Sequence, residues 1–277
     1  MLTETLTGTL AFIGGGNMAR SLIGGLIAQG LPARQIIVSD PMEAQRQLLA
    51  TQYGVRVTDS NAEAAVAAQI IVLAVKPQEL RGVAQALAST LSHQPLIISV
   101  AAGIRASHLQ TWLGGLPVVR TMPNRPALNG CGVTGLYAST QVPTTQRELA
   151  SRIMGAVGKS VWVEQETLID AVTAVSGSGP AYFFLLMELL EAAGVEQGLP
   201  AETARVLAIE TAYGSGMMAR EGSDSPAVLR QQVTSKGGTT EAALKVFEAR
   251  GMQGIVSDAV KAAAERSAEL AGELGGK

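Results

Sequence analysis

Glycines near the amino end of the sequence have the spacing of a phosphate-binding turn. The apolar run Thr9–Ile13 predicts a buried strand and Ser21–Ile27 predicts a helix, and the turn between them follows the pattern Gly-x-Gly-x-x-Ala. In that pattern Gly14 permits the tight turn, Gly16 lets the backbone approach a pyrophosphate, and Ala19 allows close packing of helix on strand. The amides and dipole at the helix start favour an anion. The turn therefore predicts dinucleotide binding, with a glycine-rich turn that binds nothing as the alternative.

A second predicted strand ends in an acidic residue where a ribose is expected. Ile36–Asp40 is an apolar run that closes on a carboxylate, and this acid follows the glycine turn by roughly the 20 residues typical of ribose recognition. The order of strand, turn, helix, strand and acid favours the dinucleotide reading. Asp40 suits the free 2′-hydroxyl of NADH and would repel the 2′-phosphate of NADPH, whereas Ser39 or Arg46 could bind that phosphate. The choice between NADPH and NADH therefore stays open.

Three further loops follow predicted strands and carry unusual residues. In a doubly wound sheet, ligands bind beyond the carboxyl ends of the strands. The loops at those ends are Val75–Gln78, Ala101–Gly103 and Thr121–Pro126. Lys76 places a cation where ribose or phosphate oxygens would lie, whereas an ordinary turn explains Ala101–Gly103 and Pro77 equally well.

Two loops in the second half combine hydroxyl groups with helix starts. Ser176–Tyr182 leads into a helix, with close approach of a ligand or a tight helix crossing as the two readings. Val233–Thr240 joins Ser and Thr hydroxyls to a Gly-Gly bend and a helix start, which suits a carboxylate. The alternative for this second loop is that Thr239 or Thr240 acts only as a helix cap.

The elements that carry these loops predict two domains. From Leu10 to about Val163 strands alternate with helices, which is typical of a parallel, doubly wound sheet. After Glu164 only helical periodicity remains, in the segments 166–175, 179–197, 200–220, 225–233 and 240–273. We therefore expect an α/β Rossmann-type domain in residues 1–165 and an all-α domain in residues 166–277. The abundance of Ala, Gly and Leu in the helical half favours a subunit interface over a self-contained bundle.

Composition excludes several classes of function. The net charge is −2 and charged residues make up 16% of the chain without a basic stripe, which argues against nucleic acid as a partner. Cys131 is the single cysteine, and with two histidines it predicts neither a disulfide nor a metal site. The start of the sequence lacks the pattern of a signal peptide. The apolar segment Ala171–Met187 is interrupted by Ser176–Pro180, so we expect no membrane span and a cytoplasmic protein.

Five stretches, taken in order, resemble the pyrroline-5-carboxylate reductase family, and the match spans nearly the whole chain. The stretches are Phe12–Met18, Ala74–Gln78, Val119–Asn124, Ala174–Tyr182 and Thr234–Thr240. The resemblance implies reduction of 1-pyrroline-5-carboxylate to L-proline by hydride transfer from NADPH or NADH, the last step of proline biosynthesis. It also implies a Rossmann domain followed by an all-helical dimerisation and substrate-binding domain, in a homodimer or homodecamer with the active site near the subunit interface.

The resemblance also assigns roles to matching positions of this sequence. It implies that the cofactor is held by Gly14, Gly15, Gly16, Asn17, Met18, Ser39, Asp40, Asn61, Ala74, Lys76, Pro77, Met122, Pro123 and Asn124. It implies that the substrate is held by Ser235, Gly238, Thr239 and Thr240. Thr240 is the candidate catalytic residue, because its hydroxyl could bond the ring nitrogen and assist its protonation.

Two positions depart from the family pattern. Arg125 stands where the family usually has Thr, and Lys236 where it usually has Pro. Both add positive charge near the expected crevice, so we expect tolerance or tighter anion binding. Without the ring of proline at position 236 the substrate loop is expected to be looser.

Two other functions compete with this reading. A 3-hydroxyacid dehydrogenase would place a catalytic lysine on a helix of the second domain, but residues 166–197 contain no lysine. A non-catalytic protein that senses dinucleotides would be expected to lose the loop Ser235–Thr240, which this chain retains.

Overall fold

The computed structural model describes residues 8–275, which form two compact units. The first unit runs up to Gly177 and takes in the chain again from Ala263, and the second is Ser178–Ala262. The expected division was a single one after residue 165. It differs because the helical turns after the last strand pack on that sheet, and because Ser267 near the chain end donates a hydrogen bond of 2.7 Å to Asp170.

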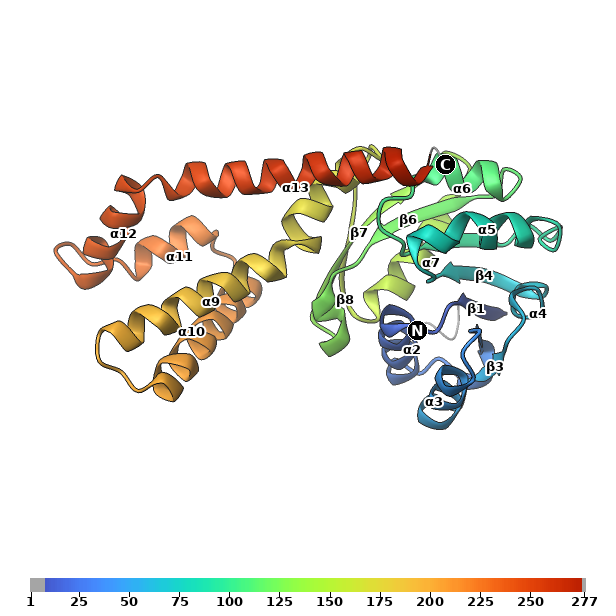
Figure 1. Cartoon of the computed structure of the whole chain (residues 1–277), viewed down its shortest axis with the longest axis horizontal. Helices are drawn as coiled ribbons and strands as arrows, with labels where there is room; N and C mark the ends of the chain where they lie inside the picture. The colour runs from blue at the N-terminus through green and yellow to red at the C-terminus, as the bar shows by residue number, and fades with distance from the viewer. Residues whose placement is uncertain (1–7, 276–277) are drawn as a thin grey trace. The chain divides into compact units, whose positions relative to one another are not determined.

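The first unit is built on an eight-stranded sheet in the order β3-β2-β1-β4-β5-β6-β7-β8 (Figure 1). All neighbouring strands are parallel except β6 and β7, which pair antiparallel with Val119 opposite Ala138. The strands are β1 Thr9–Ile13, β2 Ile36–Ser39, β3 Arg56–Thr58, β4 Ala68–Leu73, β5 Leu96–Ser99, β6 Val118–Met122, β7 Gly132–Ala138 and β8 Gly158–Trp162. The order reverses direction between β1 and β4, which is where such sheets bind ligands.

Helices connect these strands, and one more, α8, follows the last strand. They are α2 Asn17–Ala28, α3 Glu43–Tyr53, α4 Asn61–Ala65, α5 Pro77–Ala88, α6 Ala106–Trp112, α7 Thr144–Gly155 and α8 Leu168–Val172. Shorter turns are the 3-10 helices η1 Ala33–Gln35 and η2 Arg125–Asn129 and the π-helix η3 Thr173–Gly177.

The sequence reading missed one strand and one helix. Strand β7 escaped notice because two glycines, Gly132 and Gly135, dilute its apolar pattern. Helix α7 is largely polar on its surface and buries only Ala150, Ile153 and Met154. The expectation of a parallel sheet was therefore wrong for β7, whose partner β6 runs the other way.

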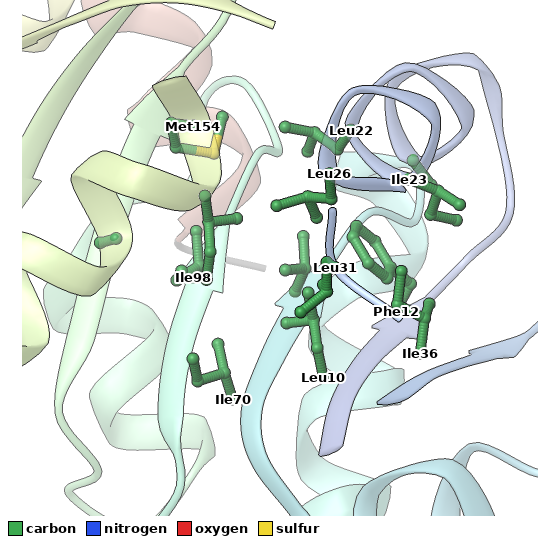
Figure 2. Packing of buried hydrophobic residues seen from close by; sticks show 14 of the residues in the cluster. Leu10, Phe12, Leu22, Ile23, Leu26, Leu31, Ile36, Ile70, Ile98 and Met154 are labelled. Atoms are coloured by element: carbon green, nitrogen blue, oxygen red, sulfur yellow. The ribbon is translucent and has the colours of Figure 1, made fainter. Parts of the chain in front are cut away.

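Alternation along β1 divides the core between the two faces of the sheet. Leu10 and Phe12 are fully buried on one face, in a cluster that includes side chains of α2 and α7 such as Leu22 and Met154 (Figure 2). Ala11 and Ile13 belong to the cluster on the opposite face, with residues of α4, α5 and α6. Each large apolar side chain buried in this way contributes about 1.5–3 kcal/mol. This core holds the end of β1, and hence the glycine turn, in place.

The second unit consists of helices. They are α9 Gly179–Glu196, α10 Ala201–Glu221, α11 Pro226–Gln232, α12 Thr239–Ala249 and the first part of α13 Met252–Gly275. Helices α9 and α10 lie side by side, joined by an ion pair of 3.1 Å between Arg205 and Glu191 (Figure 1). The single helix expected over residues 240–273 is two, because Gly251 adopts φ +71° and ends the first.

Helix α9 exposes a large apolar surface. Phe183, Phe184 and Leu189 are 64%, 60% and 56% exposed. The run Leu168–Glu196 is long and apolar enough to cross a membrane by length and composition, and 17% of its apolar 18-residue window is buried. The predicted interruption at Ser176–Pro180 does not break the helical run, because a π-helix carries the chain through it. Such a surface needs a covering partner.

Candidate functional site

The glycine turn has one glycine that the backbone requires and another that leaves space for a ligand. Gly14 adopts φ +96°, and a Cβ there would lie 2.8 Å from the carbonyl oxygen of Ala74. Gly16 is exposed, and a Cβ there would meet no atom within 4 Å. The turn thus presents open backbone beyond the end of β1, which fits the approach of a pyrophosphate.

The start of helix α2 completes this anion site. Gly16 is its N-cap and has no side chain to bond the first amides, and Asn17 beside it is exposed. Ala19 is fully buried, as expected of the residue at the helix–strand contact. With Met18 half-buried in the first turn, the predicted residues of the turn are brought together, and they fit a dinucleotide phosphate.

Asp40 braces the glycine turn from the neighbouring strand. Its Oδ2 accepts a hydrogen bond of 2.9 Å from the amide of Gly15, and its Oδ1 accepts one of 2.9 Å from the amide of Met42. A carboxylate has about four acceptor positions, so Asp40 keeps capacity for a ribose hydroxyl. The bond to Gly15 was not anticipated from the sequence, since spacing along the chain does not show which backbone amide the carboxylate reaches.

Ser39 is the last residue of β2, directly before Asp40. Its side chain is fully buried and its hydroxyl donates a hydrogen bond of 2.7 Å to Oδ1 of Asn61. Ser39 therefore orients Asn61, whose amide nitrogen is a donor suited to a ribose or phosphate oxygen. The idea that Ser39 itself bonds a 2′-phosphate does not fit this burial.

Arg46 folds back over the loop after β2. Its Nη1 donates to the carbonyl oxygens of Asp40 at 2.8 Å and of Pro41 at 3.0 Å. The loop that holds the acid thus also holds a guanidinium group. Arg46 is the group there that suits a 2′-phosphate.

The loop after β4 meets the glycine turn. The amide of Ala74 donates to the carbonyl oxygen of Ile13 at 2.8 Å, and Ala74 packs where a side chain on Gly14 would collide. Lys76 is exposed at the N-cap of α5, and Pro77 occupies the first turn of that helix. The structure therefore brings Ala74, Lys76 and Pro77 to the same edge of the sheet as the glycines.

Asn124, after β6, uses its side chain within the protein. Its Nδ2 donates to the carbonyl oxygen of Ser176 at 3.1 Å, and its Oδ1 accepts from the amide of Val133 at 2.9 Å. Both Asn124 and Pro123 are buried, whereas Met122 is half-buried. The side chain of Asn124 thus fixes the course of this loop.

In the second unit, the loop before α12 is a tight, glycine-rich bend. Gly237 adopts φ +74°, and the amide of Gly238 donates to the carbonyl oxygen of Ser235 at 3.0 Å. The N-cap of α12 is Gly238, so Thr239 and Thr240 are its first helical residues. This answers the alternative that one of the threonines is merely the cap. Ser235 and Thr239 are exposed, and Thr240 is half-buried.

A negative charge lies next to this loop on Glu241, in the first turn of α12. Its Oε2 accepts a hydrogen bond of 2.5 Å from the amide of Gly237, and its Oε1 lies 3.1 Å from Nζ of Lys245. The bond from Gly237, followed by that from Lys245, lowers the pKa of Glu241. The carboxylate is therefore ionised at neutral pH.

Neither histidine is part of these two sites. His108 on α6 stacks on Trp112, and burial and the charge of Arg105 lower its pKa. His93 contacts the carbonyl oxygen of Ala68 at 2.9 Å. Among residues 8–275, no group of three or more His, Cys, Asp or Glu side chains is placed to hold a metal ion.

Known proteins share this architecture and much of this sequence. The family model for pyrroline-5-carboxylate reductase dimerisation matches residues 166–270, and the model for NADP oxidoreductase, coenzyme F420-dependent, matches residues 9–103. A pyrroline-5-carboxylate reductase of Pseudomonas aeruginosa is 53% identical over 270 residues, which cover 97% of this chain and 99% of the relative. The chain belongs to the pyrroline-5-carboxylate reductase family.

Solved structures of this family have the same fold. A pyrroline-5-carboxylate reductase from Coxiella burnetii superposes with a TM-score of 0.93 at 42% identity, covering 95% of this chain and 98% of that one. The Plasmodium falciparum pyrroline carboxylate reductase, solved with NADP bound, gives a TM-score of 0.82 at 29% identity, with coverages of 96% and 98%. This chain is thus an NAD(P)H-dependent oxidoreductase with a Rossmann-like domain followed by a helical dimerisation domain.

Membership of the reductase family also explains the apolar helices. The dimerisation model covers α9, whose exposed Phe183, Phe184 and Leu189 are the side chains that needed a covering partner. An apolar surface of this kind is typical of a subunit interface. The chain is therefore a subunit of an oligomer.

Proposed function

We propose that this chain reduces 1-pyrroline-5-carboxylate to L-proline, the last step of proline biosynthesis, in the cytoplasm. NAD(P)H, when bound, supplies the hydride for this reduction. The single observation that supports cofactor binding most directly is the open backbone at Gly16. Two residues earlier, the positive φ of Gly14 and its closeness to Ala74 favour glycine. Membership of the reductase family supports the substrate.

The proposed cofactor residues lie at the carboxyl ends of neighbouring strands. Gly14, Gly15, Gly16, Asn17 and Met18 hold the pyrophosphate on amides and the helix dipole. Asp40 and Asn61 bind the adenine ribose, and Ser39 orients the side chain of Asn61 by a hydrogen bond. Ala74, Lys76 and Pro77 serve the nicotinamide ribose, and Met122, Pro123 and the backbone of Asn124 flank the ring.

The proposed substrate residues belong to the loop before α12. Ser235, Gly238 and Thr239 bind the substrate carboxylate with hydroxyl and amide donors, because an anion is stabilised at a helix start. Thr240 is the proposed catalytic residue. Reduction of the imine adds one hydride to the ring carbon and leaves one proton on the ring nitrogen. The Thr240 hydroxyl, half-buried in the first turn, would bond that nitrogen and favour its protonated form.

The proposed division of labour assigns residues 1–165 to the dinucleotide and residues 166–277 to dimerisation and substrate. The assembly is a homodimer or a homodecamer, and neither nucleic acid nor a membrane is a partner. Mass measurement in solution distinguishes the two assemblies.

The deciding experiment follows the absorbance of the reduced nicotinamide in two reactions: NADPH or NADH with 1-pyrroline-5-carboxylate, and the oxidised cofactor with a 3-hydroxyacid. We expect the reduced cofactor to be consumed in the first reaction and none to form in the second. Thr240→Val should lower kcat about 100-fold, in the range typical of losing an acid–base or polarising group. Thr234→Val is the matched control, because the hydroxyl of Thr234 already donates a hydrogen bond of 2.6 Å to the backbone carbonyl oxygen of Arg230. Activity only on the 3-hydroxyacid, or with neither substrate, would overturn the proposal.

A further inference from the structure

A carboxylate of the chain itself lies on the loop proposed to bind the substrate carboxylate. The side chain of Glu241 bonds the amide of Gly237, two residues before the first threonine of α12. Gly237 adopts φ +74° in the bend that precedes the helix start. The same chemical group that the substrate would bring is thus supplied by the chain itself.

The Glu241 side chain also forms an ion pair on the helix. Lys245, one helical turn further on, lies 3.1 Å from its other oxygen. Lys245 is 69% exposed, so it can follow the carboxylate outward along the helix without unpacking a core. Release of Gly237 therefore leaves Glu241 paired.

We propose that Glu241 is an internal competitor of the substrate carboxylate, which holds the amide of Gly237 in the free enzyme and withdraws toward Lys245 when substrate binds. The inference rests on the proposed function, because it assumes that the loop Ser235–Thr240 binds the substrate. The substrate carboxylate proposed to bind at Ser235, Gly238 and Thr239 would lie on the same short loop as the carboxylate of Glu241, and two negative charges so close repel each other. Glu241 thereby sets the affinity for substrate without taking part in hydride transfer.

A purely structural role for Glu241 makes the opposite prediction. A glutamate in the first turn of a helix commonly bonds a preceding amide and stabilises the helix start. If this were its only role, removing the side chain would loosen the loop and raise the KM for substrate. The two roles therefore differ in the sign of the change.

The test compares Glu241→Gln and Glu241→Ala with the wild-type enzyme. Glutamine keeps an oxygen that can accept from Gly237 and removes the charge, whereas alanine removes both. We expect both variants to lower the KM for 1-pyrroline-5-carboxylate about threefold, the size of an exposed charge interaction, with kcat within about twofold. The KM for the cofactor should not change. Glu248→Gln is the matched control, since it removes an equal charge from the exposed last turn of α12.

The outcomes separate this inference from the function on which it rests. A raised or unchanged KM in Glu241→Ala, together with a raised KM in Ser235→Ala and Thr239→Val, would overturn the competitor role and leave the substrate loop in place. If Ser235→Ala and Thr239→Val leave the KM unchanged, the assignment of the loop fails and the role of Glu241 fails with it. A lowered KM in both Glu241 variants but not in Glu248→Gln supports the competitor.

Discussion

The carboxylate of Asp40 accepts a hydrogen bond of 2.9 Å from the amide of Gly15, 25 positions earlier in the chain. The same side chain bonds the amide of Met42. The acid proposed to bind the ribose therefore also holds the turn proposed to bind the pyrophosphate. Changes at Asp40 should affect both halves of the dinucleotide.

Replacing Asp40 tests this double role and the cofactor preference together. Asp40→Ala should raise the KM for NADH about tenfold, because the ribose loses an acceptor and the glycine turn loses its brace. The wild-type enzyme should prefer NADH over NADPH in catalytic efficiency, and Asp40→Ser should move the preference toward NADPH. Arg46→Ala is the matched variant, and it should raise the KM for NADPH more than the KM for NADH. A large NADPH preference in the wild type would show that Asp40 does not select the cofactor.

Two alanine substitutions in the glycine turn should affect different properties, one the stability of the fold and the other the binding of the cofactor. Gly14→Ala should lower the free energy of unfolding by about 1–3 kcal/mol, because the residue has a positive φ and its Cβ would press on Ala74. Gly16→Ala should leave stability nearly unchanged, since nothing lies within 4 Å of its Cβ, yet raise the KM for the cofactor. Thermal melts and cofactor titrations of the pair measure this. Equal losses of stability would contradict the assignment of Gly16 to the ligand.

The buried ion pair between β6 and the segment after β8 should matter for stability. Arg120, 3% exposed, lies 3.0 Å from Glu166, which also accepts a bond from the amide of Ala106. Arg120→Met should cost about 3 kcal/mol, because it leaves Glu166 without its cation. The double variant Arg120→Met with Glu166→Gln should recover part of this loss in urea unfolding. An additive loss would mean that the two side chains act independently.

His108 should make stability depend on pH. Burial and Arg105 lower its pKa in the folded state, so the unfolded chain binds a proton more readily. The neutral form is then favoured by folding, and stability should fall as the pH drops below about 6.5, the pKa of an unperturbed histidine. His108→Gln should lose less stability than the wild type between pH 7.5 and 5.5. His93→Gln is the control, and equal slopes for wild type and His108→Gln would refute the expectation.

Much of the fold followed from local pattern. The runs Thr9–Ile13 and Ile36–Ser39 are strands because continuous apolar residues suit a sheet buried on both faces. Strand β7 was not predicted, because its glycines interrupt the apolar pattern. Its antiparallel pairing with β6 also cannot be inferred from the residues of β7 alone.

The sequence alone determined the order of strand, glycine turn, helix and acid, and it determined which residue types stand at the ends of the strands. The tertiary structure decided what those side chains touch. It buried Ser39 against Asn61, committed Asn124 to Ser176 and Val133, and set Glu241 on Gly237. The reason is physical: periodicity along a chain reports which face of an element is buried, whereas a hydrogen bond depends on the positions of two atoms in space. Only packing brings those atoms within 3 Å of each other.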